Sequence, residues 1–288
     1  MSTLRQKISL TLLPIVIMGQ AWAFSSLEER SLYHPDMAGF PTSPLEAVIL
    51  PAFKAKIQDV YFKASDGVRL NGWYIPAESG KPSFVFAHGN GGNIGDRWTI
   101  VKILAGRGYG VLAFDYRGYG KSEGTPGEAG LYRDMEAASH YLLNEQQIPY
   151  SQQIALGESI GSGVAVDLAT RIPYRAVVLY SAYTSLPAVA AHLRDTHQLG
   201  WLGVLPLRFI MRQHFDSLSK INQIQSPLLI MHGEDDDMMP LSMPRALYDQ
   251  ATAPYKKLLI IPNAGHNDVF HEGADRLLDE LEQLLVKT

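Results

Sequence analysis

The chain has 288 residues, of which 46% are hydrophobic and 19% are charged, so it is long enough to bury one large core. Its formal net charge is -4 and no long run carries one sign, which argues against a nucleic-acid partner. The absence of cysteine excludes a disulfide framework, a thiolate zinc site and a cysteine nucleophile.

The N-terminus carries the pattern of a targeting segment. Two basic residues within the first seven positions precede an apolar run over 8–18, and a small-x-small triplet follows at 21–23. Such a sequence is typical of a secretory signal peptide. An uncleaved membrane anchor and a buried N-terminal helix are the alternatives, although the run is shorter than the roughly 20 apolar residues of a spanning helix. We expect residues 1–23 to be a signal peptide or N-terminal membrane anchor. The protein would then be exported (periplasmic or secreted) or anchored facing outside the cytoplasm.

Residues 24–56 form an N-terminal extension, in which four prolines argue against long helices. From residue 57 the pattern changes. The stretches 58–63 and 68–75 flank Asp66-Gly67, which predicts a β-hairpin.

Apolar runs then alternate with helix-like segments to the end of the chain. The runs that resemble buried strands are 83–87, 110–115, 154–157, 176–180, 227–231 and 257–261. The helical segments are 97–106, 130–144, 160–170, 244–251 and 273–286. This alternation predicts an α/β fold over 57–288, a mostly parallel eight-stranded sheet with helices on both faces.

One interval breaks the alternation. Residues 185–225 carry no strand signal, and the middle of the interval is conspicuously apolar. We expect a short helical cap over about 186–225, because an apolar segment inserted near a pocket usually lines it. Helices packed on the body of the sheet are the alternative.

The stretch Gly157-Glu158-Ser159-Ile160-Gly161 lies between a strand-like run and a helix-like run of small residues. A serine between two glycines at a strand–turn–helix junction is the nucleophile-elbow pattern. The turn exposes the serine hydroxyl above the sheet edge, and a side chain at either glycine would collide with neighbouring backbone. A glycine-flanked loop serine is the alternative interpretation of this motif taken alone.

A serine nucleophile requires a base, usually histidine, and an acid that orients the histidine. The loop His232 to Pro240 contains three adjacent aspartates after the strand at 227–231, and which of them is the acid stays open here. An acidic surface turn or a weak divalent-cation site is the alternative. The base is predicted to be His266, on the loop after the strand at 257–261, with His271 as its competitor.

An acyl-transfer site also needs two backbone N–H donors for the oxyanion. One would come from Ile160, the residue after the nucleophile. The other would come from Asn90, in the glycine-rich loop that follows the strand at 83–87. A phosphate-binding loop is the alternative, but the Gly-Lys-Ser/Thr ending that it requires is absent.

Five blocks taken together, in this order, resemble the Bem-type α/β-hydrolases. These include bacterial single-pass hydrolases and the mammalian abhydrolase-domain depalmitoylases. The blocks are His88 to Asn93, Phe114 to Ser122, Gly157 to Gly161, His232 to Pro240 and Gly265 to Asp268. The family pattern of His-Gly, two variable residues and then the acid selects Asp236, and its Gly-His-Asn-Asp loop selects His266. The family's frequent N-terminal anchor implies membrane association through residues 1–23.

The resemblance and the motifs together imply a serine hydrolase with the triad Ser159, Asp236 and His266. It would cleave ester or thioester bonds of a small-molecule or lipid-like acyl substrate, without a cofactor or metal. The apolar cap would supply the acyl-binding residues Trp201, Leu202 and Leu205. A serine peptidase or aminopeptidase of the same fold and a non-catalytic scaffold are the alternatives. The sequence sets no oligomeric state.

Overall fold

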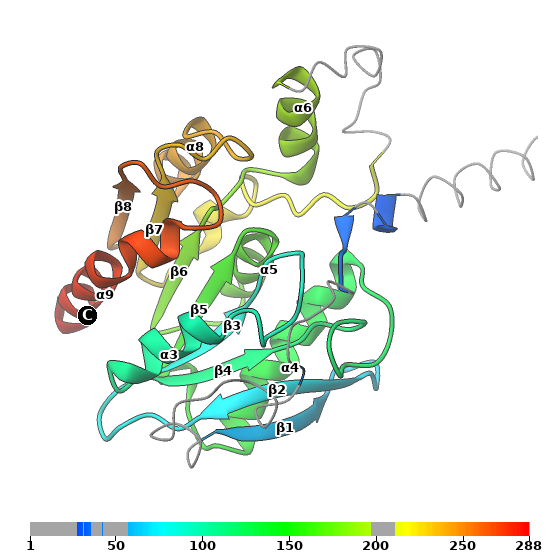
Figure 1. Ribbon diagram of the computed structural model, residues 1–288. Coiled ribbons are helices and arrows are strands. Elements are labelled where there is room, and N and C mark those ends of the chain that lie inside the picture. Colours follow the sequence, from blue (N-terminus) through cyan, green and yellow to red (C-terminus); the bar gives the residue numbers. More distant parts are fainter. Residues whose placement is uncertain (1–27, 31, 36–41, 43–56, 197–210, 288) are drawn as a thin grey trace, which may run out of the picture.

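The computed structural model describes residues 28–30, 32–35, 42, 57–196 and 211–287, and these contain one eight-stranded sheet (Figure 1). The strand order is β1-β2-β4-β3-β5-β6-β7-β8. The strands are β1 (Gln58–Lys63), β2 (Arg69–Ile75), β3 (Ser83–Ala87), β4 (Gly110–Phe114), β5 (Gln153–Glu158), β6 (Ala176–Tyr180), β7 (Leu228–Gly233) and β8 (Lys256–Ile261).

The sheet combines an antiparallel edge with a parallel, buried centre. β1 and β2 form the predicted antiparallel hairpin, and β2 also pairs antiparallel with β4. The remaining strands are parallel, and β3, β4 and β6 are buried along their whole length. Parallel strands connected by helices are covered on both faces, so an unbroken apolar run is the expected pattern. The predicted α/β-hydrolase sheet is confirmed.

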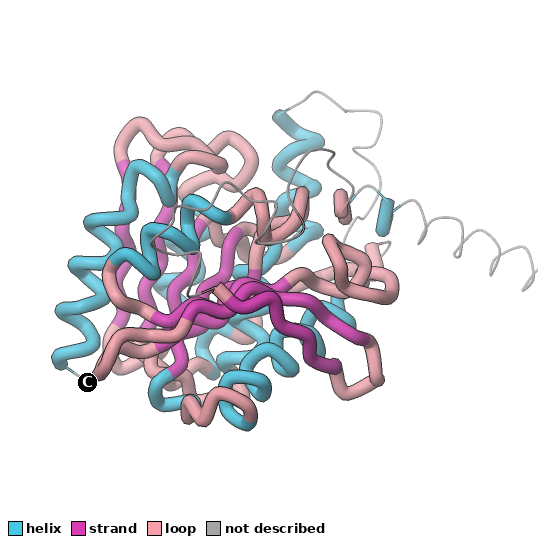
Figure 2. Tube along the Cα trace, turned by 60° about the horizontal axis from the view of Figure 1, so that its bottom comes forward, coloured by secondary structure: helices cyan, strands magenta, loops and turns pink. Residues whose placement is uncertain are grey.

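The helices divide between the two faces of the sheet (Figures 1 and 2). α3 (Trp98–Gly106) and α9 (Val269–Lys287) share one hydrophobic cluster. α4 (Glu128–Asn144), α5 (Ile160–Ala169) and α8 (Ser242–Gln250) share the cluster on the opposite face. Two short 3₁₀ turns, η1 (Tyr150–Gln152) and η3 (Ile221–Gln223), precede β5 and β7.

α6 (Leu186–Thr196) follows β6 and projects from the carboxyl edge of the sheet (Figure 1). It begins where the cap was predicted to begin. The cap residues proposed to line the acyl site, Trp201, Leu202 and Leu205, lie outside the described residues.

The N-terminal segment 1–23 also lies outside the described residues. Within the part of the chain that the structure describes, no helix has the length and apolar character needed to cross a bilayer.

The last helix begins earlier than the sequence predicted. α9 starts at Val269, four positions before Gly273, where the sequence predicted its start. Gly273 does not mark a helix boundary but a close packing contact inside the helix. A Cβ at Gly273 would lie only 2.6 Å from the Met231 sulfur and 2.8 Å from Cγ1 of Ile261. The helix therefore rests directly on β7 and β8 at this residue.

We expect Gly273→Ala to lower the free energy of unfolding by about 1–2 kcal/mol, because the added methyl group would overpack this contact. Gly106→Ala is the matched control, since a Cβ at Gly106 meets nothing within 4 Å. That control should raise stability by up to about 1 kcal/mol through helix propensity. Urea denaturation of both variants would measure the difference, and equal effects would contradict the packing argument.

Candidate active site

Ser159 forms the turn between β5 and α5. Its backbone is in an unusual conformation, with φ 50° and ψ −118°, and its N–H donates to the Tyr180 carbonyl at 3.0 Å. A positive φ is strained for a residue with a side chain. A Cβ at Gly157 would lie 2.5 Å from the Gly161 carbonyl oxygen, and one at Gly161 would overlap the backbone of Ala87. The two glycines are therefore required by the close approach of strand, turn and helix.

His266 links the serine to a carboxylate. Its Nε2 lies 3.1 Å from Ser159 Oγ, and its Nδ1 lies 2.8 Å from Asp236 Oδ2. An ionised carboxylate only accepts hydrogen bonds, so the proton of a neutral His266 is placed on Nδ1. The lone pair of Nε2 then faces the Ser159 hydroxyl, which donates to it. The three groups form a continuous hydrogen-bonded line although they come from three separate loops.

Of the three adjacent aspartates, Asp236 is the one that contacts His266. Its side chain is fully buried, whereas Asp235 and Asp237 are exposed. Burial raises the pKa of Asp236, but the hydrogen bond from His266, the attraction to the His266 ring when it is protonated and the Met239 N–H together outweigh that effect and leave this pKa below its usual value. The N–H groups of Met238 and Met239 donate to its other oxygen at 3.1 and 2.8 Å. Asp236 is thus ionised and held from both sides.

Two residues to which the sequence analysis assigned no role support the hydrogen bonds between Ser159, His266 and Asp236. The Ser181 hydroxyl donates to the His266 carbonyl at 2.9 Å, and Ser181 itself has a positive φ of 48°. His232 Nε2 lies 2.7 Å from the Met239 carbonyl and 3.3 Å from Asp236 Oδ2. Burial lowers the pKa of His232, so its single Nε2 proton serves as a neutral donor. Both residues lie at carboxyl ends of strands, which is the positional signal that could have identified them.

The ion pair between Glu158 and Arg97 holds the glycine-rich loop that follows β3. Glu158 accepts hydrogen bonds from Arg97 Nε at 2.9 Å and from the Gly89 N–H at 3.1 Å. Burial raises the pKa of Glu158, yet the Arg97 guanidinium more than offsets this and lowers it below the ordinary value. The residue before the candidate nucleophile is therefore an ionised anchor for the loop that carries Asn90.

The backbone N–H groups of Asn90 and Ile160 are the predicted oxyanion donors. Ile160 is the first residue of α5, where a backbone N–H has no intrahelical acceptor. No hydrogen bond among the described residues uses the Asn90 N–H. The clash that a Cβ at Gly161 would make with Ala87 and His88 shows that the loop passes directly against the start of α5.

A buried acid lies behind this loop. Asp115 accepts the Ile94 N–H at 2.9 Å and lies 3.6 Å from His88 Nε2. Burial raises the pKa of Asp115 to about 7 and lowers that of His88 to about 3. Arg117, two residues further along the chain, forms ion pairs with Asp66 and Asp134, with N···O distances of 2.8 Å in each case.

Two other features lie away from this cluster. His271, the competing base, is exposed on α9 and has no hydrogen bond to Ser159 among the described residues.

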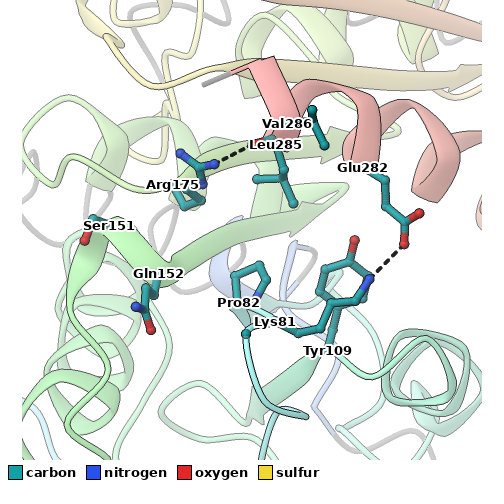
Figure 3. A pocket seen from close by; sticks show the side chains of 10 residues that line it. Lys81, Pro82, Tyr109, Ser151, Gln152, Arg175, Glu282, Leu285 and Val286 are labelled. Atoms are coloured by element: carbon teal, nitrogen blue, oxygen red, sulfur yellow. Dashed lines mark hydrogen bonds and ion pairs between the residues drawn. The ribbon is translucent and has the colours of Figure 1, made fainter.

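A hollow of about 510 Å³ lies between the C-terminal end of α9 and the amino ends of β3 and β5 (Figure 3). Lys81 pairs with Glu282 at its rim. Because Ser159 lies at the carboxyl end of β5, this hollow is at the opposite edge of the sheet.

The parallel sheet, the strained serine at the strand–helix turn and the hydrogen-bonded line to His266 and Asp236 define the α/β-hydrolase class. A family model described as "Serine aminopeptidase, S33" matches residues 78–208. The chain is 34% identical over 276 residues to an uncharacterized protein of Mycobacterium tuberculosis, Rv2307c, covering 95% of this chain and 92% of that protein. It is 34% identical to alpha/beta hydrolase domain-containing protein 17B of Xenopus laevis, covering 81% of this chain and 77% of the relative. The chain therefore belongs to the α/β-hydrolase family.

Solved structures show the same fold. The esterase Pf2001 of Pyrococcus furiosus superposes with a TM-score of 0.69 at 22% identity, covering 89% of this chain and 97% of the esterase. An alpha-beta hydrolase of Vibrio vulnificus superposes with a TM-score of 0.65 at 23% identity, covering 79% and 82%.

The buried Asp115 predicts a specific pH dependence of stability. Its folded-state pKa of about 7 lies above the value of about 3.9 in an unfolded chain, so the folded protein binds this proton more tightly. The contribution is fully present below about pH 4 and is lost as the pH rises to about 7, at about 1.4 kcal/mol per unit.

Asp115→Asn keeps the neutral form at every pH. Relative to this variant, the wild-type free energy of unfolding should fall between about pH 4 and 7 and then level off. Urea denaturation at several pH values would measure the difference, and parallel curves for the two proteins would contradict a raised pKa.

Proposed function

We propose that this protein is a serine hydrolase that cleaves carboxylic ester or thioester bonds through an acyl-enzyme. The observation that carries the proposal is the line of two hydrogen bonds from Ser159 through His266 to Asp236. A serine hydroxyl needs a base within hydrogen-bond reach to act as a nucleophile, and a base needs an orienting acid. The strained turn at Ser159, which lifts the hydroxyl above the sheet edge, supports the same function.

The proposed reaction has two halves. Ser159 Oγ attacks the substrate carbonyl while its proton passes to His266 Nε2, and the N–H groups of Asn90 and Ile160 stabilise the oxyanion. The tetrahedral intermediate collapses, and the leaving alcohol or thiol takes the proton from His266. Water then gives a proton to the same nitrogen and attacks the acyl-enzyme, which releases the acid and restores Ser159. Asp236 holds the ring in orientation and stabilises the imidazolium, without itself being protonated.

An acyl group is the substrate class that the sequence of the cap favours. The segment 197–210 is rich in large apolar residues, including Trp201, Leu202 and Leu205. In the sequence it follows α6, and α6 itself follows β6 at the carboxyl edge of the sheet, the edge at which Ser159 lies. An apolar lining next to a nucleophile suits an acyl chain, and the fold neighbour from Pyrococcus furiosus is described as an esterase.

Aminopeptidase activity is the second candidate, because the matching family model is described as a serine aminopeptidase. An aminopeptidase must hold a free α-amino group, which calls for an unpaired carboxylate near the nucleophile. The carboxylate nearest in sequence, Glu158, is already paired with Arg97 through both of its oxygens. Glu158 is therefore not available for this role, and the preference for esters rests on the apolar segment after α6 and on the esterase among the fold neighbours.

A substrate panel with a nucleophile variant tests this function. We expect the purified protein to hydrolyse p-nitrophenyl acyl esters of graded chain length and acyl thioesters faster than aminoacyl p-nitroanilides. Ser159→Ala should lower kcat by at least about a thousandfold, because the covalent step is lost. A fluorophosphonate probe should label the wild type and not the variant. Absence of both hydrolysis and labelling in the wild type would contradict an enzymatic function, and faster anilide cleavage would favour the aminopeptidase.

The choice of acid is tested within the aspartate loop itself. Asp236→Asn should lower kcat by about 10⁴, because the amide favours the wrong tautomer of His266. Asp235→Asn and Asp237→Asn are matched controls on exposed neighbours, and both should retain nearly the wild-type rate. Steady-state kinetics on one ester measures all three. A near-normal rate for Asp236→Asn would move the acid elsewhere.

A further inference from the structure

A short N-terminal segment lies against the loop that carries Asn90. We call it the N-terminal strap and define it as the described part of residues 28–35. The His34 N–H donates to the Asn90 carbonyl at 3.0 Å, and the His34 carbonyl accepts the Gly92 N–H at 3.1 Å. The Asn90 side-chain amide donates to the Leu32 carbonyl at 3.0 Å. The strap thus adds a small parallel bridge to the loop and holds Asn90 by both its backbone and its side chain.

The strap also contacts the segment that begins at residue 211, after the predicted cap. In Figure 1 this segment is yellow and lies next to the strap, which is blue. The Glu28 carboxylate accepts the N–H groups of Arg212 and Gln213 at 3.0 and 2.9 Å. The Tyr33 hydroxyl, on a side chain that is 4% exposed, donates to Gln213 Oε1 at 3.0 Å.

This returning chain is one half of the neck of the cap, which we define as residues 184–186 and 212–218. The Leu186 N–H donates to the His214 carbonyl at 2.8 Å, and the Leu218 N–H donates to the Thr184 carbonyl at 3.0 Å. Glu128 accepts the next two N–H groups, those of residues 214 and 215, at 2.6 and 2.8 Å. Two carboxylates, one from the strap and one from α4, therefore satisfy four consecutive backbone donors at the base of the cap.

The loop needs such an external restraint. Gly89, Gly91 and Gly92 surround Asn90, and glycine leaves the backbone free to rotate. An oxyanion donor must point within a narrow range at the developing charge to stabilise it. The Asn90 N–H lies in the peptide plane between Gly89 and Asn90, so its direction is set by how the planes on either side are held. Glu158 holds the plane before it through the Gly89 N–H. The plane after it is held at the Asn90 carbonyl, which accepts the His34 N–H of the strap and also the Tyr119 hydroxyl at 2.9 Å.

We propose that the N-terminal strap is a positioning element of the active site, which orients the Asn90 N–H and anchors the neck of the cap. This inference rests on the proposed function. It assigns the strap, which lies outside the predicted hydrolase domain of 57–288, to the active site. The loop contacts should affect kcat, because they act on the transition state. The neck contacts should affect KM for long acyl chains, because they act on the cap.

The loop contact is tested by one backbone hydrogen bond. His34→Pro removes the N–H that donates to Asn90, whereas His34→Ala keeps it, and the His34 side chain is exposed. In the full-length protein we expect His34→Pro to lower kcat at least tenfold with KM within twofold, and to slow fluorophosphonate labelling in parallel. His34→Ala should match the wild type. Equal kcat values for the two variants would overturn the proposal.

The neck contact is tested by conservative changes that keep the fold. Glu28→Gln and Tyr33→Phe should raise KM for long-chain esters several-fold while leaving KM for acetyl esters nearly unchanged. Glu145→Gln and Tyr255→Phe are matched controls on exposed residues. A loss of thermal stability with unchanged chain-length dependence at low temperature would show a purely structural role and overturn this half.

Hydrogen–deuterium exchange separates this proposal from the proposed function. In His34→Pro, the amides of residues 88–93 should exchange at least tenfold faster than in His34→Ala, whether or not the protein hydrolyses esters. If the wild type is inactive but this change occurs, the proposed function fails and the strap still holds the loop. If the exchange is unchanged, the strap proposal fails independently of any activity.

Discussion

The close approach of β5, Ser159 and α5 is the constraint on which the rest of the site depends. Ser159 has a positive φ, and side chains at Gly157 or Gly161 would collide with backbone atoms. The same contact sets the glycine-rich loop after β3 against the first N–H of α5. Strain at one residue is therefore stabilised by packing on every side, which is the usual condition under which strained residues persist at functional sites.

Around this turn each shielded carboxylate has hydrogen-bond or ion-pair partners. Glu158 is neutralised by Arg97, and Asp236 is held by His266 and two backbone donors. An unpaired buried charge would be strongly destabilising, so each carboxylate is tied to the groups it positions. The strap and α4 repeat this principle at the neck of the cap, where Glu28 and Glu128 satisfy backbone donors that would otherwise lack partners.

Much of this arrangement was predictable from local patterns. The strand and helix positions followed from apolar runs and their spacing, and the order of the serine, aspartate and histidine loops followed from the family blocks. The start of α9 was wrong by four residues, because a glycine that looked like a boundary is a contact point between helix and sheet. Ser181 was missed because its partner His266 is 85 positions away in the sequence. His232 belongs to the His-Gly motif, but the motif does not show that its ring contacts the Met239 carbonyl and Asp236.

The sequence by itself determined the alternation of buried strands and helices, the glycine pattern at Ser159 and the identity of the loops at the carboxyl edge. These properties depend on side-chain size, hydrophobicity and chain order, which are local. The family pattern in the sequence selected Asp236, and the tertiary structure shows that Asp236, and not its two neighbours, reaches His266. Only the tertiary structure decided that the described residues of the strap, 28–30 and 32–35, contact the Asn90 loop and the neck of the cap. Such contacts join residues up to 185 positions apart, and they depend on how separately predicted elements pack together in space.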